Sequence, residues 1–303
     1  MQQGRKLDVF DSRMGEMHGL KIVRLPNGSI FLLFGFLELL TGIKHLSAVQ
    51  HSQEKIMSNQ PIALVTGGSR GIGASIAARL ANDGYHVILH YGSSADTARE
   101  VLANIEASGG SGELVQADLS RTEDISQLVA TVIETLDGRK LDVLVNNAGV
   151  AEFVPFKDTD AATIDRQYAI NVRAPFLLTS SLLAVLADDA RIVFTSSIVA
   201  QTHFDAIPAY AITKGAIDTL VRHLAVTLGE RGIRVNAVAP GAIDTDMSTW
   251  LRSEEGVQTA HSIQALKRVG QPDDIAGTVA FLAGSDSRWV TGQVIDTSGG
   301  TKL

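Results

Sequence analysis

The stretch that decides the fold is Ile62-Ala-Leu-Val-Thr-Gly-Gly-Ser-Arg-Gly-Ile-Gly73, in which a short apolar run leads directly into a cluster of glycines. The run Ile62–Val65 has the length and composition of a buried strand, and a helical pattern follows it. Glycines at such a junction let the backbone approach a pyrophosphate closely, and the helix N-terminus offers unpaired N–H groups with a partial positive charge. The order of strand, glycine turn and helix therefore favours a dinucleotide-binding site.

Beyond this turn, strand-like runs alternate with helical patterns. We expect strands at 62–65, 86–90, 113–116, 143–145, 191–195, 234–238 and 293–295, and helices at about 71–83, 95–108, 122–136, 161–187, 209–230 and 272–283. Strands separated by helices form right-handed βαβ units, and the resulting parallel sheets carry helices on both faces. The sequence therefore predicts a single α/β domain with a doubly wound, Rossmann-type, seven-stranded parallel sheet.

The composition bounds the class of protein. Of 303 residues, 45% are hydrophobic and 19% charged, which is ample for a sizeable core. A net charge of −7 argues against nonspecific binding to nucleic acid. The absence of cysteine excludes disulfides, thiolate metal sites and cysteine nucleophiles. We also expect no metal site, because no close His/Asp/Glu cluster has ligand spacing, and we expect a cytoplasmic location.

Residues 1–56 do not match the rest of the chain. They contain a polar start and then the apolar run Ile30–Ile43, which carries Glu38 and is about 14 residues long. Spanning a bilayer needs roughly 20 residues, and the run begins too deep for a simple signal peptide. Met57 resembles a normal protein start. We therefore expect 1–56 to be a non-native or poorly ordered extension of a domain spanning 57–303, with a membrane-associating helix as the alternative.

The end of the second strand indicates which dinucleotide is bound. A site for NAD usually places an Asp or Glu there, which binds the ribose 2′-hydroxyl and would repel a 2′-phosphate. Here the chain reads His90-Tyr-Gly-Ser93-Ser94, without an acid, and Arg70 in the glycine turn can donate paired hydrogen bonds to a phosphate. We therefore predict NADP(H) in preference to NAD(H). The alternative for Arg70 is a solvated turn residue.

Two further strand ends carry polar residues that suit a nucleotide. Asp118, after the third strand, can accept a bond from the adenine amino group or belong to the N-cap region of the next helix. The fourth strand ends in Asn146-Asn-Ala-Gly149. A buried Asn there ties neighbouring strands together or contacts the cofactor directly, while Ala148 and Gly149 leave room for a ribose.

Tyr210 and Lys214 are the candidate catalytic pair. They are four residues apart in a predicted helix and therefore project from the same face, although such a pair alone is usually an ordinary surface pair. A phenol with a pKa of about 10 is a poor proton donor near neutrality, and a nearby positive charge lowers that pKa by roughly 1–3 units. Ser197 closes a predicted buried strand, so its hydroxyl is expected at the strand's carboxyl end, where open parallel sheets bind ligands.

Together these motifs resemble those of the short-chain dehydrogenase/reductase family over residues 57–303. The motifs that appear in the family's order and spacing are Thr66-Gly-Gly-Ser-Arg-Gly-Ile-Gly73, Asn146-Asn-Ala-Gly149, Ser197, Tyr210-x-x-x-Lys214 and Pro240-Gly241 with Thr245. The closing segments Lys267–Pro272 and Trp289–Asp296 are similar to those of the branch that contains 3-oxoacyl-[acyl-carrier-protein] reductases.

The resemblance implies reduction of a ketone or 3-oxoacyl group to a secondary alcohol by hydride transfer from NADPH. In the family's scheme Tyr210 donates the proton to the carbonyl oxygen, and Ser197 hydrogen-bonds that oxygen. Lys214 lowers the Tyr210 pKa and holds the nicotinamide ribose. Asn171 matches the fourth member, which keeps a water in a proton relay by kinking its helix. The cofactor contacts that we expect are Gly67, Ser69, Arg70, Gly71, Ile72, Gly73, Tyr91, Ser93, Asp118, Leu119, Asn147, Ala148, Gly149, Tyr210, Lys214, Pro240, Gly241, Ile243 and Thr245.

The resemblance also implies a lid and a set of partners. The backbone near Ile243 and the Thr245 hydroxyl would meet the nicotinamide amide, and the polar residues 246–268 would form a mobile lid. Helices 161–187 and 209–230 would pack between the subunits of a tetramer or dimer. The expected partner is a small carbonyl or alcohol substrate, with no nucleic acid and no membrane. Two alternatives remain: a sugar, steroid or xenobiotic substrate, and a non-catalytic NADP(H)-binding protein.

Overall fold

The computed structural model describes residues 22–24, 30–32, 60–205 and 207–302. The chain divides into two units, 1–59 and 60–303. In the first unit, strands β1 (Ile22–Arg24) and β2 (Ile30–Leu32) pair antiparallel. The rest of the segment 1–56 lies outside the described residues, and so does most of its apolar run. Its assignment as an extension stays a prediction.

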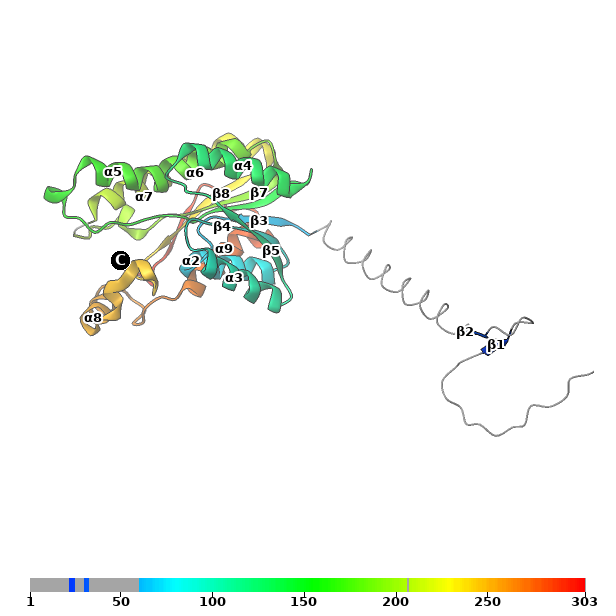
Figure 1. Ribbon diagram of the computed structural model, residues 1–303. Coiled ribbons are helices and arrows are strands. Elements are labelled where there is room, and N and C mark those ends of the chain that lie inside the picture. Colours follow the sequence, from blue (N-terminus) through cyan, green and yellow to red (C-terminus); the bar gives the residue numbers. More distant parts are fainter. Residues whose placement is uncertain (1–21, 25–29, 33–59, 206, 303) are drawn as a thin grey trace, which may run out of the picture. The chain divides into compact units, whose positions relative to one another are not determined.

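The second unit is built on one seven-stranded parallel sheet, which confirms the predicted fold class (Figure 1). In the sheet order β5-β4-β3-β6-β7-β8-β9, the strands are β5 (Ser111–Gln116), β4 (His86–Tyr91), β3 (Ile62–Val65), β6 (Leu141–Asn146), β7 (Leu186–Thr195), β8 (Arg234–Pro240) and β9 (Val294–Thr297). The chain builds outward from β3 to one edge, then returns and builds from β6 to the other. The carboxyl ends of β3 and β6 therefore form the switch point at which such sheets bind ligands.

Helices cover both faces of the sheet, as Figure 1 shows. One layer contains α4 (Thr122–Leu136), α5 (Ala161–Tyr168), α6 (Ala174–Leu182) and α7 (Pro208–Leu228), and the other contains α2 (Gly71–Asn82), α3 (Ala95–Ala107) and α9 (Pro272–Ala283). Alternate strand residues feed two separate apolar clusters: Leu64 and Leu144 belong to one, Val65 and Val145 to the other. Burial on both faces is why the strands read as continuous apolar runs.

Short 3-10 turns link these elements. They are η1 (Phe156–Asp158), η3 (Ile198–Ala200), η4 (Gly229–Arg231), η5 (Asp246–Arg252) and η6 (Ser285–Ser287). In the part of the chain that the structure describes, no helix is both long and apolar enough to cross a membrane.

The helix predicted over 161–187 is not continuous. A π-helical turn, η2 (Ala169–Arg173), separates α5 from α6, and α6 ends at Leu182. Pro175 has no N–H to donate to the carbonyl of Asn171, so one i→i−4 bond is missing at the point where the helical geometry changes. Strand β7 begins at Leu186 instead of the predicted 191. The sequence prediction missed this start because Asp188 and Asp189 lie in the first half of the strand, and aspartate is depleted in strands.

The predicted lid, 246–268, contains regular structure that the sequence prediction missed. After η5 comes α8 (Glu254–Ile263), capped by Ser253, whose hydroxyl accepts a bond from the Gly256 amide at 3.1 Å. A serine followed by two glutamates is a helix-start signal that was present in the sequence. The C-terminal end of α8 contacts the last residues of the chain, which lie beside it in Figure 1. The Lys302 amide donates a hydrogen bond to the Ile263 carbonyl at 2.7 Å.

Candidate active site

The glycine turn after β3 is a backbone cradle without room for side chains. Gly67 adopts a φ of +66°, which favours glycine. A Cβ added at Gly73 would lie 2.1 Å from the Gly67 carbonyl oxygen. Among the described residues, no side chain caps α2, and its first turn holds no acidic residue. The free amides of that turn therefore fit an anionic pyrophosphate.

Thr66 and Asn147 hold the cradle against the end of β6. The Thr66 hydroxyl accepts bonds from the amides of Asn147 and Ala148, both at 3.0 Å. The Asn147 side chain donates to the carbonyls of Thr66, at 3.0 Å, and Gly67, at 3.3 Å. Asn147 thus has the strand-tying role that was one of its two interpretations. A direct cofactor contact stays a prediction for Asn147, Ala148 and Gly149.

The predicted adenosine-side residues differ in their surroundings. Arg70 is exposed and lies 3.5 Å from the carboxylate of Asp246, at the start of η5. Ser93 is exposed, and Tyr91 is half-buried. The Asp118 carboxylate accepts a bond from the Ser120 amide at 2.9 Å, and the Ser120 side chain, together with that amide, holds the Asp118 pKa below its usual range. Arg121, not Asp118, occupies the N-cap position of α4.

Two predicted cofactor residues have apolar side chains that pack into the core, and their cofactor contacts stay predictions. The Leu119 side chain is buried in an apolar cluster of the core. Only its backbone is left to face a nucleotide, because an apolar side chain after a strand packs inward when a core is within reach. Ile72 is half-buried and packs against the cluster on the opposite face.

The loop after β8 reaches the glycine turn from the other side. A Cβ added at Gly71 would lie 3.2 Å from the Thr245 methyl, so these two predicted cofactor residues are neighbours. Ile243 is buried, and the loop is fixed by backbone bonds from Asp244 to Gly270, at 2.9 Å, and from Gly270 to Ala242, at 3.1 Å. The residues predicted to contact the pyrophosphate and those predicted to contact the nicotinamide therefore lie side by side.

The four predicted catalytic residues meet at the carboxyl edge of the sheet. Ser197 follows β7, Tyr210 and Lys214 lie in the first turns of α7, and Asn171 lies in η2. The Ser197 side chain lies near enough to the Tyr210 hydroxyl to lower its pKa, and the Lys214 Nζ lies 5.5 Å from the centroid of the Tyr210 ring. Gly149 lies between Asn171 and Lys214. A Cβ added at Gly149 would lie 3.2 Å from the Asn171 Oδ1 and 3.5 Å from the Lys214 Nζ.

Lys214 is a buried lysine whose ammonium group donates a hydrogen bond. Its side chain is 3% exposed, and Nζ donates to the Thr195 carbonyl at 2.7 Å. Burial lowers the pKa of Lys214 to about 8, while the nearby Asp218 carboxylate acts in the opposite direction. An ammonium group with a pKa close to neutrality suits a site at which charge develops during the reaction.

The expected lowering of the Tyr210 pKa is not found in the free protein. Burial raises the pKa of Tyr210 to about 12, and the hydrogen bond with Ser197 opposes this rise. Burial raises the pKa because it removes the charged phenolate from water, which disfavours the deprotonated form. The phenol is consequently protonated at neutral pH, which is the state that a proton donor requires.

The Asn171 side chain connects the loop after β6 to α7. Its Oδ1 accepts from the Val150 amide at 2.9 Å, and its Nδ2 donates to the Val150 carbonyl at 2.8 Å and to the Thr213 hydroxyl at 3.1 Å. Thr213 in turn donates to the Tyr210 carbonyl at 2.7 Å. Asn171 therefore positions the helix that carries Tyr210. Its predicted part in a water relay stays a prediction.

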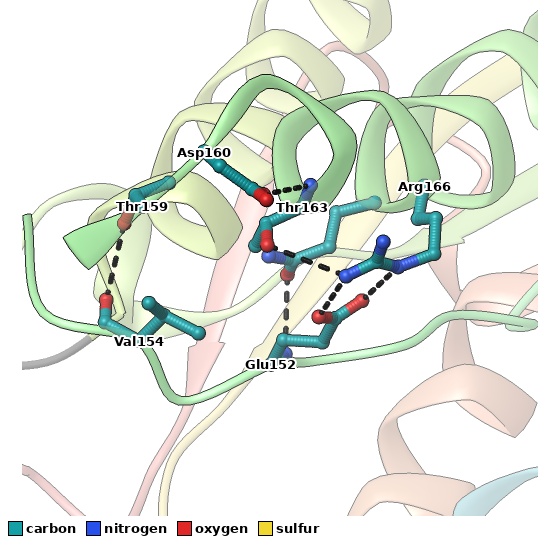
Figure 2. Close-up of polar contacts among 7 residues, drawn as sticks. Glu152, Val154, Thr159, Asp160, Thr163 and Arg166 are labelled. Carbon is teal, nitrogen blue, oxygen red and sulfur yellow. Dashed lines mark hydrogen bonds and ion pairs between the residues drawn. The ribbon is translucent and has the colours of Figure 1, made fainter.

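The loop that leaves β6 is anchored to α5 by the contacts drawn in Figure 2. Arg166 donates two bonds to the Glu152 carboxylate, at 3.0 and 2.7 Å, and these bonds hold the Glu152 pKa below its usual range. Asp160 caps α5 by accepting from the Thr163 amide at 2.8 Å. The part of this loop next to Asn171 therefore has a defined path.

Sequence reasoning missed a buried carboxyl group behind the catalytic pair. The Ser196 hydroxyl donates to Asp218 Oδ1 at 2.5 Å, and both residues are buried. Burial raises the pKa of Asp218, and the bond from Ser196 opposes that rise. The spacing of Tyr210, Lys214 and Asp218 at intervals of four would have revealed it, because such residues share one helix face. Asp218 therefore links the serine-bearing turn to the helix of Tyr210.

Comparison with known proteins finds oxidoreductases that match most of this chain. A family model described as enoyl-(acyl carrier protein) reductase matches residues 67–302. An uncharacterised oxidoreductase from Methylorubrum extorquens is 41% identical over 244 residues, covering 80% of the chain and 97% of that protein. A probable tetrahydroxynaphthalene reductase from Zymoseptoria tritici is 36% identical over 252 residues, covering 78% and 93%. The structure of an angucycline C-6 ketoreductase with bound NADP matches with a TM-score of 0.77 at 39% identity, covering 80% of this chain and 96% of that one.

Proposed function

Because the chain belongs to the short-chain dehydrogenase/reductase family, we propose that it reduces a ketone to a secondary alcohol with NADPH. The observation that carries the proposal is the meeting of Ser197, Tyr210 and Lys214 at the carboxyl edge of the sheet, at the same edge as a glycine cradle with free amides. A proton donor, a hydrogen-bond donor and a cation are the groups that carbonyl reduction needs beside a hydride source.

The residues divide the work as follows. Bound NADPH supplies a hydride to the carbonyl carbon. Ser197 donates a hydrogen bond to the carbonyl oxygen, on which negative charge develops. The Tyr210 phenol transfers its proton to that oxygen, which completes the alcohol. The Lys214 ammonium group stabilises the phenolate left behind, and solvent later restores its proton.

NADPH is favoured over NADH by the residues around the end of β4. No acid stands there, and Arg70 and Ser93 are exposed and can donate to a 2′-phosphate. The angucycline ketoreductase with bound NADP supports the same choice. The ion pair of Arg70 with Asp246 is exposed, so a phosphate can take the place of the carboxylate at small cost.

Arg70→Ala is expected to raise the Kd for NADPH about tenfold or more and to change the Kd for NADH less than about twofold. Only NADPH carries the phosphate that the guanidinium binds, and a hydrogen bond to a charged group contributes about 1.5–3 kcal/mol. Quenching or transfer of protein fluorescence measures both constants. Arg79→Ala, which removes another exposed arginine from the same helix, is the control. Equal losses for the two cofactors would remove Arg70 from the phosphate site.

The rate is expected to depend on pH through Lys214. As the pH rises through about 8, kcat/KM for NADPH should fall, because this constant reports the free enzyme and Lys214 loses its charge there. The folded pKa of about 8 lies below the ordinary 10.5, so the unfolded chain binds more protons between these values and the unfolding free energy should rise with pH across that window. A pH–rate profile and urea titrations test both signs. A flat profile through pH 8 would contradict the assignment of Lys214.

Two classes of ketone are candidate substrates. The sequence favours a 3-oxoacyl thioester, through the segments similar to 3-oxoacyl reductases. Relatives named for tetrahydroxynaphthalene, versicolorin and angucycline reduction favour a polycyclic aromatic ketone as the second candidate. Several aromatic residues near the candidate site are exposed and suit a flat ring system: Phe153, Phe156 and Trp250.

Initial rates of NADPH oxidation by the full chain distinguish the candidates. The substrates are an acetoacetyl thioester, a hydroxylated naphthalenone or anthrone, and plain ketones. Fast turnover of the thioester alone assigns the protein to acyl-chain chemistry, and fast turnover of the aromatic ketone alone assigns it to the second class. No turnover of any carbonyl despite tight NADPH binding would favour the non-catalytic alternative.

A homo-oligomer also belongs to the proposal. The helices predicted to pack between subunits expose large apolar side chains in the single chain, namely Tyr168 on α5, Phe176 on α6, and Ile212 and Val226 on α7. Their gathering on the helices predicted to pack between subunits supports burial of these side chains in an oligomer. Light scattering of the purified protein should give a mass of two or four chains. A monomer at micromolar concentration would contradict it.

A further inference from the structure

His90 is a buried polar side chain to which none of the roles above assigns a function. It lies near the carboxyl end of β4, with 2% of its surface exposed. Its imidazole stands between two predicted cofactor segments, the glycine cradle after β3 and the turn after β5. The backbone takes part in the same junction, since the Gly68 amide donates to the His90 carbonyl at 2.9 Å.

Both ring nitrogens of His90 have defined partners. The Gly67 amide donates to Nδ1 at 3.2 Å, so Nδ1 carries no proton. The other nitrogen, Nε2, lies 3.1 Å from the Ala117 carbonyl, which can only accept, so Nε2 carries the proton. Only the neutral imidazole in this tautomer satisfies both contacts. Burial agrees with that state, because it lowers the pKa of His90 to about 4.

The two partners of His90 sit next to residues with predicted cofactor contacts. Gly67 opens the cradle, and the peptide group of Ala117 leads directly into Asp118, the candidate adenine contact. One rigid ring thus fixes the separation of the phosphate-binding turn from the adenine-side turn. A cofactor that contacts both turns binds best when that separation is preset, since binding then orders little of the protein.

We propose that His90 is a positioning residue for the cofactor, which presets the phosphate and adenine sides of the site by bridging the Gly67 amide and the Ala117 carbonyl. This inference rests on the proposed use of NADPH. His90 touches no reacting atom, so it acts on cofactor affinity and not on the chemical step. The only sequence signal at this position was that no acid stands at the end of β4.

The test compares three substitutions in the full chain. His90→Leu removes both contacts and is expected to raise the Kd for NADPH at least about tenfold, with kcat at saturating NADPH within about twofold. His90→Asn keeps an acceptor that can reach the Gly67 amide, and it should recover most of the lost affinity. His86→Leu is the matched control at the amino end of the same strand, where the imidazole contacts Ser111, at 2.9 Å, and Glu113, at 3.2 Å.

The thermal midpoint of each variant separates positioning from general loss of structure. His86→Leu is expected to lower the midpoint while leaving the Kd for NADPH within about twofold of wild type. If His90→Leu weakens NADPH binding no more than His86→Leu does, or lowers kcat as much as affinity, the positioning role is wrong.

Imidazole NMR signals of the wild-type protein give a readout that needs neither a variant nor a ligand. The expected result is a His90 ring with a slowly exchanging Nε2 proton, an unprotonated Nδ1 and no titration between about pH 6 and 8. A ring that titrates in this range would overturn the inference even if every variant failed to fold. If the wild type does not bind NADPH, the proposed function fails, and the ring's tautomer still decides whether His90 bridges the two turns.

Discussion

Tyr210→Phe is expected to lower kcat for carbonyl reduction at least about 10³-fold and to leave the Kd for NADPH within about twofold. The substitution keeps the ring and removes only the hydroxyl group, which is the proposed proton donor. Proton transfer by a positioned side chain contributes about 10²–10⁴ in rate, and the raised pKa of the phenol means that the donor is fully protonated near pH 7.

Single-turnover reduction at saturating NADPH measures this loss without interference from product release. Tyr85→Phe is the matched control, because this hydroxyl donates to the Ala283 carbonyl at 3.2 Å next to the amino end of β4, away from the carboxyl edge of the sheet, and its loss should leave the rate unchanged. A Tyr210→Phe rate within about tenfold of wild type would mean that another group donates the proton, and the proposed roles of Ser197 and Lys214 would then need to be rebuilt around that group.

Gly73→Ala is expected to abolish NADPH binding and to lower the free energy of unfolding by about 1–3 kcal/mol. The added Cβ would lie 2.1 Å from the Gly67 carbonyl oxygen and 2.5 Å from the Asn147 side-chain nitrogen. The nearest atom belongs to the Gly67 backbone, so the strain cannot be relieved by rotating the Asn147 side chain alone. The cradle must open, and the amides that would hold the pyrophosphate then lose their common direction.

Gly215→Ala supplies the control for that substitution. Gly215 lies within α7, and an added Cβ there meets no described atom within 4 Å. Alanine should therefore stabilise the helix by roughly 0.5–1 kcal/mol and leave cofactor binding intact. Denaturant titration and NADPH binding of both variants make the comparison. Normal affinity in Gly73→Ala would show that the turn after β3 is not the phosphate site.

The sequence was sufficient for the parts of this molecule that depend on local pattern. Both-face burial makes Ile62–Val65 an unbroken apolar run, and glycines between strand and helix have few uses besides a tight approach of the backbone. The seven strands and the helix of Tyr210 and Lys214 were therefore predictable. The resemblance implied a kink at Asn171, and Pro175 marks the same place, but the helix was still predicted as continuous over 161–187 because the apolar pattern runs through both residues.

Properties that depend on tertiary burial were beyond the sequence. Spacing alone predicted that Lys214 would lower the Tyr210 pKa, whereas burial in the free protein raises it. In the sequence, the position of His90 was informative only because no acid stands at the end of that strand. The His90 ring bridges Gly67 and Ala117 because the strands that precede these two residues end beside it. The burial of the Leu119 side chain in the core, which leaves only its backbone for the predicted cofactor contact, was likewise not visible in the sequence. Each of these outcomes is set by what surrounds a residue in three dimensions.

The strand order has a consequence for how the protein is made. Strands β3, β4 and β5 are contiguous in the chain and adjacent in the sheet, so the half that carries the glycine cradle can assemble while the catalytic half is still being synthesised. During that interval β3 has one unpaired edge, since Ala63 must wait for Val143 of β6. An open edge of a buried, apolar strand is a site of aggregation. We therefore expect the nascent chain to need a chaperone most between the emergence of β5 and that of β6.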